Sequence, residues 1–130
     1  METSEIVTRY AVSRLSPEGI VLKVTSPGAE YTLADAREEL EAVWKISGGR
    51  RRPLLADIRN IKSIDQDARS FYAGAESASR VAAVALLISS PLSRIIGNFF
   101  LGMTKSSISI KLYTSEAAAM AWLRGFIEPG

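Results

Sequence analysis

The chain of 130 residues contains neither cysteine nor histidine. Without them it has no disulfide, thiol nucleophile, Cys/His zinc site, imidazole base or histidine-based catalytic triad. Carboxylate, lysine, tyrosine, serine and threonine chemistry remains, but no spacing in the sequence forces such groups together. We therefore expect a protein without catalytic residues, cofactor or metal site.

The sequence also lacks a large excess of one sign of charge, and it lacks a long apolar run. Sixteen basic residues against fourteen acidic ones give a formal net charge of +2, which does not predict a nucleic-acid-binding surface. The longest apolar run, residues 81–88, is too short to cross a bilayer. Residues 1–6 lack the basic start of an export signal. We expect a soluble, cytoplasmic protein with no transmembrane segment.

Arg50, Arg51 and Arg52 form the one dense basic run. Nucleic-acid-binding segments usually add basic residues on one face and interleaved aromatic residues, which are missing here. We interpret the run as a solvated loop, and an anionic protein partner is the functional alternative.

What is present is the composition of a globular domain, with 47% hydrophobic and 23% charged residues. The length predicts one domain over residues 1–130. The order of the expected elements predicts an α/β fold that begins with a β-hairpin and continues as repeated βα units, which gives a mainly parallel five-stranded sheet with about four helices. The strands are predicted at residues 6–15, 20–24, 54–58, 81–88 and 108–112, and the helices at 33–47, 63–78, 91–103 and from 115 onward.

Capping sequences predict where the helices start. Thr32 and Ser63 are each followed three residues later by an acidic or amide side chain, which approximates a capping box. Ser90 precedes a proline, a combination typical of a first helical turn. Thr114 or Ser115 is expected to cap the last helix.

The stretch from Asp57 to Ala68, DIRNIKSIDQDA, resembles the signature of STAS domains, the bacterial anti-sigma-factor antagonists and their relatives. In that family a strand ends in Asp, two aliphatic residues follow at this spacing, and a second Asp opens a helix. The second half, at residues 86–94, 97–102 and 111–116, is similar to an uncharacterised bacterial branch grouped with STAS and SEC14-like domains. The resemblance implies a STAS-like, or SpoIIAA-like, fold along nearly the whole chain.

One position departs from the STAS pattern. Phosphorylated STAS antagonists carry a serine directly after the second Asp, and a partner kinase modifies it. This chain has Gln66 there, so the phosphoacceptor equivalent is lost. The resemblance thus implies the fold without the usual switch. We interpret the next residue, Asp67, as stabilising the helix dipole rather than mimicking a phosphate.

Two carboxylates are expected near the carboxyl end of one strand, the edge where open α/β sheets place ligands. Asp57 ends the strand, and Asp65 precedes the next helix. They are a candidate acid/base or ligand-binding pair, although we favour structural roles for both. An enzyme would have to depend on these two residues or on Tyr72.

A second candidate site surrounds the start of the third helix. Ser89, Ser90, Ser93 and Arg94 offer hydroxyls, a guanidinium and the free N–H groups of the first turn, which would suit a phosphate or carboxylate. The alternative is that Ser90 is a cap and Arg94 is solvated.

The predicted third helix, residues 91–103, is apolar beyond one face. Phe100 and Leu101 fall outside the arc that a helical wheel turns toward the sheet. An apolar patch on a small domain is usually an interface, and Gly97 would permit close approach. We therefore expect these three residues at a self-association interface. The sheet-facing arc consists of Leu92, Ile95, Ile96, Phe99 and Met103.

These features predict a non-catalytic protein-interaction module that forms a homo-oligomer, most simply a homodimer, through the third-helix region. An unknown protein is a further expected partner. The alternative, implied by the SEC14 likeness, is a carrier of a small apolar or anionic, lipid-like ligand. That ligand would lie between the third helix and the sheet, with Ser90 and Arg94 at its polar end.

Overall fold

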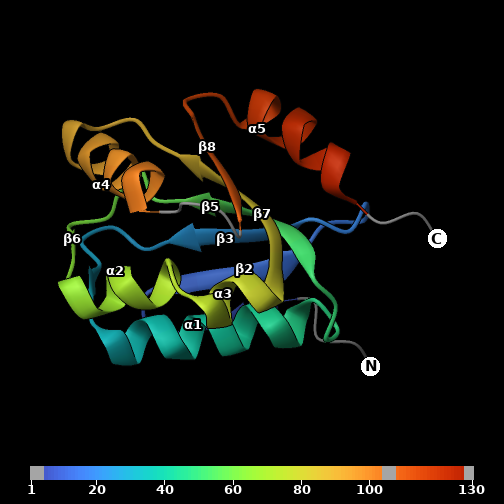
Figure 1. Cartoon of the computed structure of the whole chain (residues 1–130), viewed down its shortest axis with the longest axis horizontal. Coiled ribbons are helices and arrows are strands. Elements are labelled where there is room, and N and C mark those ends of the chain that lie inside the picture. Colours follow the sequence, from blue (N-terminus) through green and yellow to red (C-terminus); the bar gives the residue numbers. More distant parts are fainter. Residues whose placement is uncertain (1–4, 104–107, 128–130) are drawn as a thin grey trace.

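The computed structural model describes residues 5–103 and 108–127 as alternating strands and helices (Figure 1). The elements are β1 (Glu5–Val7), β2 (Ala11–Leu15), β3 (Val21–Thr25), β4 (Glu30–Tyr31), α1 (Leu33–Ile46), β5 (Arg52–Asp57), β6 (Ser63–Ile64), α2 (Gln66–Tyr72), α3 (Ala75–Arg80), β7 (Val81–Leu87), α4 (Pro91–Met103), β8 (Ser109–Tyr113) and α5 (Glu116–Leu123), followed by a 3-10 turn at Arg124–Phe126.

The main sheet has the strand order β1-β2-β3-β5-β7-β8. Antiparallel pairing joins β1, β2 and β3, and parallel pairing joins β3, β5, β7 and β8. The predicted α/β class, the initial hairpin and the mainly parallel sheet are confirmed, and β8 lies at an edge of the sheet. A second, two-stranded sheet pairs β4 with β6.

The prediction of five strands is wrong by one in the main sheet. The segment expected as a single strand over residues 6–15 is divided into β1 and β2, which pair with each other. The Thr8 amide donates to the carbonyl of Ala11 at 2.9 Å and closes a turn between them. The apolar alternation continues through this turn, so it does not reveal the break.

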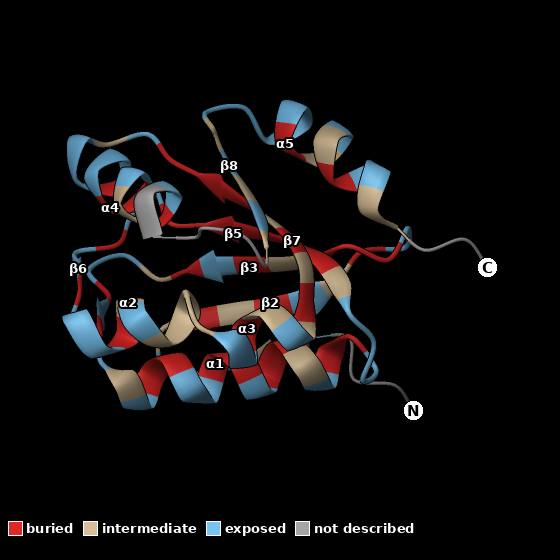
Figure 2. Cartoon of the chain, viewed as in Figure 1, coloured by how far each residue is buried: buried red, intermediate tan, exposed pale blue. Residues whose placement is uncertain are grey.

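The two faces of the main sheet have different coverings. On one face, α1, α2 and α4 pack on Val21, Leu54, Ala56 and Leu86, and α3 lies beside them. On the other face, α5 packs on Ile20, Leu55, Ala83, Ala85 and Leu87. Figure 2 shows the central strands β5 and β7 buried along most of their length between these two layers.

Most helix starts agree with the predicted caps. Thr32 and Asp35 form a full capping box at α1. Ser115, rather than Thr114, caps α5 by accepting from the Ala118 amide at 3.2 Å. The expected capping box at Ser63 is wrong, because this residue lies in β6 and pairs with β4.

The helix expected over residues 63–78 is two helices. It begins at Gln66, where the Asp65 carboxylate caps it by accepting from the Ala68 amide at 2.8 Å. It ends at Tyr72, and α3 starts after Gly74, which has an extended backbone conformation. Glycine is a poor helix former, which is consistent with the break between α2 and α3 at this residue.

Candidate functional site

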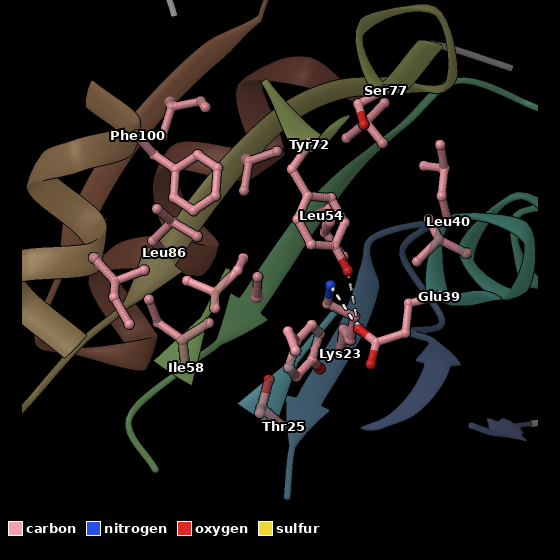
Figure 3. A pocket seen from close by; sticks show the side chains of 18 of the residues that line it. Lys23, Thr25, Glu39, Leu40, Leu54, Ile58, Tyr72, Ser77, Leu86 and Phe100 are labelled. Atoms are coloured by element: carbon pink, nitrogen blue, oxygen red, sulfur yellow. Dashed lines mark hydrogen bonds and ion pairs between the residues drawn. The ribbon is translucent and has the colours of Figure 1, made fainter. Parts of the chain in front are cut away.

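A cavity of about 80 Å³ lies between the main sheet and helices α1 to α4. Aliphatic and aromatic side chains make up most of its wall. Figure 3 shows Phe100, Leu86 and Ile58 toward one side and Lys23, Thr25 and Glu39 toward the other, with Tyr72 between them. The cavity therefore has an apolar end near α4 and a polar end at β3 and α1.

Strand and helix periodicity place the polar end inside the protein. Lys23 and Thr25 share the inward side of β3 with Val21. Glu39 lies on the buried stripe of α1 beside Leu40. A charged residue at an inward strand position thus faces a charged residue on the apolar stripe of the covering helix.

Lys23 and Glu39 form a buried ion pair, with 3.1 Å between Lys23 Nζ and Glu39 Oε1. Their residues are only 6% and 1% exposed, respectively. The Tyr72 hydroxyl donates to the same carboxylate oxygen at 3.3 Å. Lys23 Nζ also lies 4.8 Å from the centre of the Tyr72 ring. The cluster of Lys23, Glu39 and Tyr72 thus joins β3, α1 and α2 through one carboxylate oxygen.

The tyrosines at this end stay protonated. Burial and then the nearby Glu39 carboxylate raise the pKa of Tyr72 well above its ordinary value of 10.0. The same two causes, in the same order, raise the pKa of Tyr31, which lines the cavity and stacks on Tyr10 with 5.6 Å between ring centres. Both side chains therefore offer hydroxyl groups and not phenolates.

Three buried oxygen atoms at the polar end have no hydrogen-bond partner among residues 5–103 and 108–127. They are Glu39 Oε2, the Tyr31 hydroxyl oxygen and Thr25 Oγ1, none of which makes a hydrogen bond of standard geometry there. The Tyr31 hydroxyl lies close enough to the Glu39 and Thr25 side chains for both to affect its pKa. Buried polar atoms are nearly always satisfied, and leaving one unpaired costs about 1–3 kcal/mol. A buried ion pair also tends to stabilise a fold less than apolar residues of similar volume would. The polar end therefore lowers the stability of the fold, which is typical of a binding site.

The carboxylates predicted as a pair have separate structural partners. Asp57 binds the Arg59 side chain through two contacts of 3.0 and 2.8 Å and accepts from the Arg59 amide at 3.1 Å. Asp65 caps α2. Each carboxylate therefore has a partner within the chain, and the two do not bind each other. Gln66 is exposed in the first turn of α2.

The serines at the start of α4 bind one another. Ser93 Oγ accepts from the amides of Ser89 and Ser90, each at 3.0 Å, and donates to the Ser90 carbonyl at 3.0 Å. Ser90 Oγ accepts from the Ser93 amide at 3.0 Å. Ser93 is fully buried and Arg94 is exposed. This internal network uses the groups that an anion would need.

The arginine run is anchored to the backbone at two of its members. Arg51 Nε donates to the Ala78 carbonyl and Arg52 Nε to the Ser47 carbonyl, each at 2.9 Å. These bonds tie the end of the loop to α3 and the start of β5 to the end of α1.

The helical wheel misplaces the faces of α4. Phe100 is 7% exposed and lines the cavity, whereas Leu92 and Ile95, expected in the core arc, are 40% and 66% exposed. Leu101 is 43% exposed, as predicted. The side chain of Met103, also assigned to that arc, is outside the described residues. The buried stripe consists of Ser93, Ile96, Gly97 and Phe100.

Close approach explains the rotated helix. A Cβ atom on Gly97 would lie 2.8 Å from Leu112 Cδ2 of β8. The small residues Ser93 and Gly97 let α4 lie directly on the sheet, although a hydrophobicity wheel gives them little weight. Gly97 therefore serves packing within the chain, and of the three predicted interface residues only Leu101 is exposed.

The sequence interpretation missed Lys23, Glu39, Thr25 and Tyr31 as site residues, and it gave Tyr72 only as part of a possible enzyme site. Two signals were present. Lys23 has the same strand parity as Val21, and Glu39 has the same helical face as Ala36 and Val43. Opposite charges at two inward positions indicate a buried pair, but their contact depends on how α1 lies on the sheet.

The described part of the chain holds no group of three or more Asp and Glu side chains arranged for a metal ion. None of its helices has the length and apolar character needed to cross a membrane.

Three comparisons place the chain among known proteins. Residues 14–127 match the model of a family described as a domain of unknown function, DUF7793. No curated protein matches the chain.

Two solved structures are similar to it. An uncharacterised protein of the DUF3478 family from Shewanella loihica PV-4, with a SpoIIAA-like fold, is 15% identical and matches with a TM-score of 0.61 over 95% of this chain and 98% of that chain. A protein of unknown function from Arthrobacter sp. FB24 is 32% identical over 85% of this chain and 96% of that one, with a TM-score of 0.34. The first likeness confirms the STAS-like fold.

Proposed function

The chain belongs to the DUF7793 family, and from the cavity in this SpoIIAA-like fold we propose that it is a non-catalytic module that binds a small, mostly apolar ligand. The ligand lies between the main sheet and helices α1 to α4. One observation carries the proposal: the apolar cavity ends at buried oxygen atoms that have no partner among the described residues. Small-molecule sites commonly combine an apolar wall with a few polar groups that orient the ligand.

The charges at the cavity favour a neutral ligand over an anionic one. Lys23 is the one cation among the described lining residues, and Glu39 already neutralises it at 3.1 Å. An anion would also meet the negative charge of Glu39. Ser90 and Arg94, the polar end expected from the sequence, are not among the residues that line the cavity.

Binding fits these groups better than proton transfer. Tyr72 and Tyr31 have pKa values raised by burial, so they do not act as bases near neutral pH. Glu39 Oε1 is engaged by both Lys23 and Tyr72. These fixed hydrogen bonds hold the carboxylate in one position, which suits recognition.

The ligand would enter between α2 and α4. Tyr72 of α2 meets Phe100 of α4 edge to face, with 6.4 Å between ring centres. Both rings line the cavity, and they meet between the two helices. Separation of the rings would open the apolar end.

Native mass spectrometry of the purified protein tests the proposal. We expect a small non-covalent adduct on the wild-type chain and its loss in Ala56→Leu, which adds a larger side chain at a buried cavity-lining position. Ala34→Leu is the matched control, because Ala34 is exposed on α1. An adduct retained in Ala56→Leu, or absent from the wild type, would contradict the proposal.

Self-association is a second candidate function, favoured by the exposed apolar side chains of α4. Ile95, the most exposed of them, is 66% exposed. We expect a dimer mass by light scattering and a monomer mass for Ile95→Arg. Asn98→Arg, at an exposed polar position of the same helix, should leave the dimer intact. A monomer at high wild-type concentration would rule this function out.

A further inference from the structure

On the premise of the proposed ligand cavity, we propose that the ligand is a small, neutral alcohol whose hydroxyl group donates to Glu39 Oε2. The polar end of the cavity accepts one hydroxyl group, and the apolar end accepts a short hydrocarbon. This assigns a chemical class to the ligand and gives Glu39 the role of the group that selects it.

Glu39 has one oxygen in use and one free of hydrogen bonds. Oε1 binds Lys23 Nζ at 3.1 Å and the Tyr72 hydroxyl at 3.3 Å (Figure 3). Oε2 is buried and has no partner within the described chain, and the residue as a whole is 1% exposed. A carboxylate oxygen only accepts hydrogen bonds. The missing partner must therefore be a donor.

Two further groups show why the donor is a hydroxyl. The Tyr31 hydroxyl and Thr25 Oγ1 are buried at the same end of the cavity, and neither makes a hydrogen bond of standard geometry among the residues described. The Tyr31 hydroxyl lies near both Glu39 and Thr25. Each can donate as well as accept. A ligand hydroxyl that donates to Glu39 can accept from one of them, so a single group satisfies atoms of two side chains.

Charged ligands fit the same place poorly. A carboxylate would approach the Glu39 carboxylate and would have no proton to donate to Oε2. An ammonium group would lie beside Lys23 Nζ, which is itself only 3.1 Å from Glu39. In a site shielded from water either like-charge contact is unfavourable. The pair of Lys23 and Glu39 thus excludes ions of both signs.

The volume of the cavity limits the hydrocarbon part. It measures about 80 Å³, whereas an engineered apolar cavity of about 150 Å³ holds benzene. A chain of about four carbon atoms is therefore a suitable probe. Its methyl end would lie near Leu86 and Phe100, on the apolar side of the cavity in Figure 3.

The test is a titration of the wild-type protein with three probes. Binding of each probe is measured from the NMR chemical shifts of the methyl groups that line the cavity. The probes are butan-1-ol, its isomer methyl propyl ether, and butanoate. The ether has the same atoms as the alcohol and lacks only the donor. We expect the alcohol to bind about tenfold more tightly than the ether, because the ether leaves Oε2 unpaired. Butanoate should show no saturable binding.

A double variant shows whether Glu39 causes the preference. Lys23→Met/Glu39→Leu replaces both charges with apolar side chains, a change that buried ion pairs often tolerate. In this variant the alcohol should lose its tenfold advantage over the ether. Urea unfolding of the same sample establishes that it folds.

The outcomes separate this inference from the proposed function. Equal affinity of the wild type for alcohol and ether would overturn the alcohol assignment and leave the ligand cavity intact. Tighter binding of butanoate would also overturn it. An alcohol preference that persists in the double variant would exclude Glu39 as its cause. If none of the three probes shifts the cavity methyl groups, both proposals are wrong.

Discussion

The two faces of the main sheet differ in how closely their side chains pack and in whether they bury charged groups. On the α5 face, alanine and leucine side chains such as Ala83, Ala85 and Leu123 are completely buried against one another. On the other face, four helices leave a cavity and enclose the ion pair of Lys23 and Glu39. The buried polar atoms without partners, as far as the chain is described, all come from this second side.

The two faces are therefore expected to contribute differently to the stability of the fold. A close-packed apolar layer gains stability from every contact, so the α5 face is expected to contribute strongly to folding. Buried charges and empty volume cost stability, so the cavity face retains features that folding alone does not favour. Substitutions that treat both faces alike should therefore have unequal effects.

The largest expected effect comes from removing one charge of the buried pair. Glu39→Leu leaves Lys23 buried without its partner, and we expect the free energy of unfolding to fall by about 4 kcal/mol. The double variant Lys23→Met/Glu39→Leu should return to within about 1 kcal/mol of the wild type. Urea unfolding, followed by tryptophan fluorescence, measures both. A double variant as unstable as the single one would show that the pair is needed for stability.

The same deletion on the two faces should differ in cost. Leu123→Ala opens a new cavity under α5 and should cost about 4 kcal/mol, whereas Leu86→Ala enlarges an existing cavity and should cost about 3 kcal/mol. Leu123 is fully buried, and Leu86 borders empty volume. Thermal and urea unfolding of the two variants give the comparison. A larger loss for Leu86→Ala would mean that the cavity face is as tightly packed as the other.

Added volume should reverse this order. Ala85→Leu inserts three carbon atoms into the filled α5 face, and we expect it to cost about 2 kcal/mol. Ala56→Leu, on the neighbouring strand, points into the cavity and should change the stability by less than about 1 kcal/mol. Both alanines are buried, at 0% and 3% exposure, so exposure does not explain a difference between them. Equal losses would argue that the cavity wall does not admit extra volume.

Local patterns were enough to predict most of the fold. The run from Val81 to Leu87 is apolar at both parities, and it forms a central strand buried on both faces. Thr32 with Asp35 and Ser115 were recognisable as caps, because a cap depends on residues three positions apart. Errors arose where packing decides the outcome. α4 turns Ser93 and Gly97 to the sheet because small side chains allow close approach.

The candidate site was less predictable than the fold for a similar reason. Asp57, Asp65 and the serines near α4 were predicted as site residues because they lie at or beside the ends of strands and helices, and in the structure each has a local partner. Lys23 and Glu39 lie inside regular elements, where a single charge is usually taken as exposed. Only the contact between β3 and α1 turns them into a pair, and that contact joins residues distant in sequence.

The smallest expected effect concerns the pH dependence of the cavity face. Burial raises the folded-state pKa of Tyr72 above its ordinary value of 10.0, so folding favours the protonated hydroxyl. Its contribution to stability is complete below about pH 10 and is lost as the pH rises through the folded-state pKa. Tyr72→Phe should cost about 1 kcal/mol at pH 8 through the lost hydrogen bond to Glu39. Between pH 10 and 11 this cost should shrink by up to about 1 kcal/mol.

Urea unfolding of the wild type and of Tyr72→Phe measures this effect. Both proteins retain Lys23 and Tyr31, so the difference between their urea midpoints isolates the contribution of the Tyr72 hydroxyl. A gap that stays constant up to pH 11 would mean that the Tyr72 hydroxyl reaches water, in conflict with an enclosed polar end.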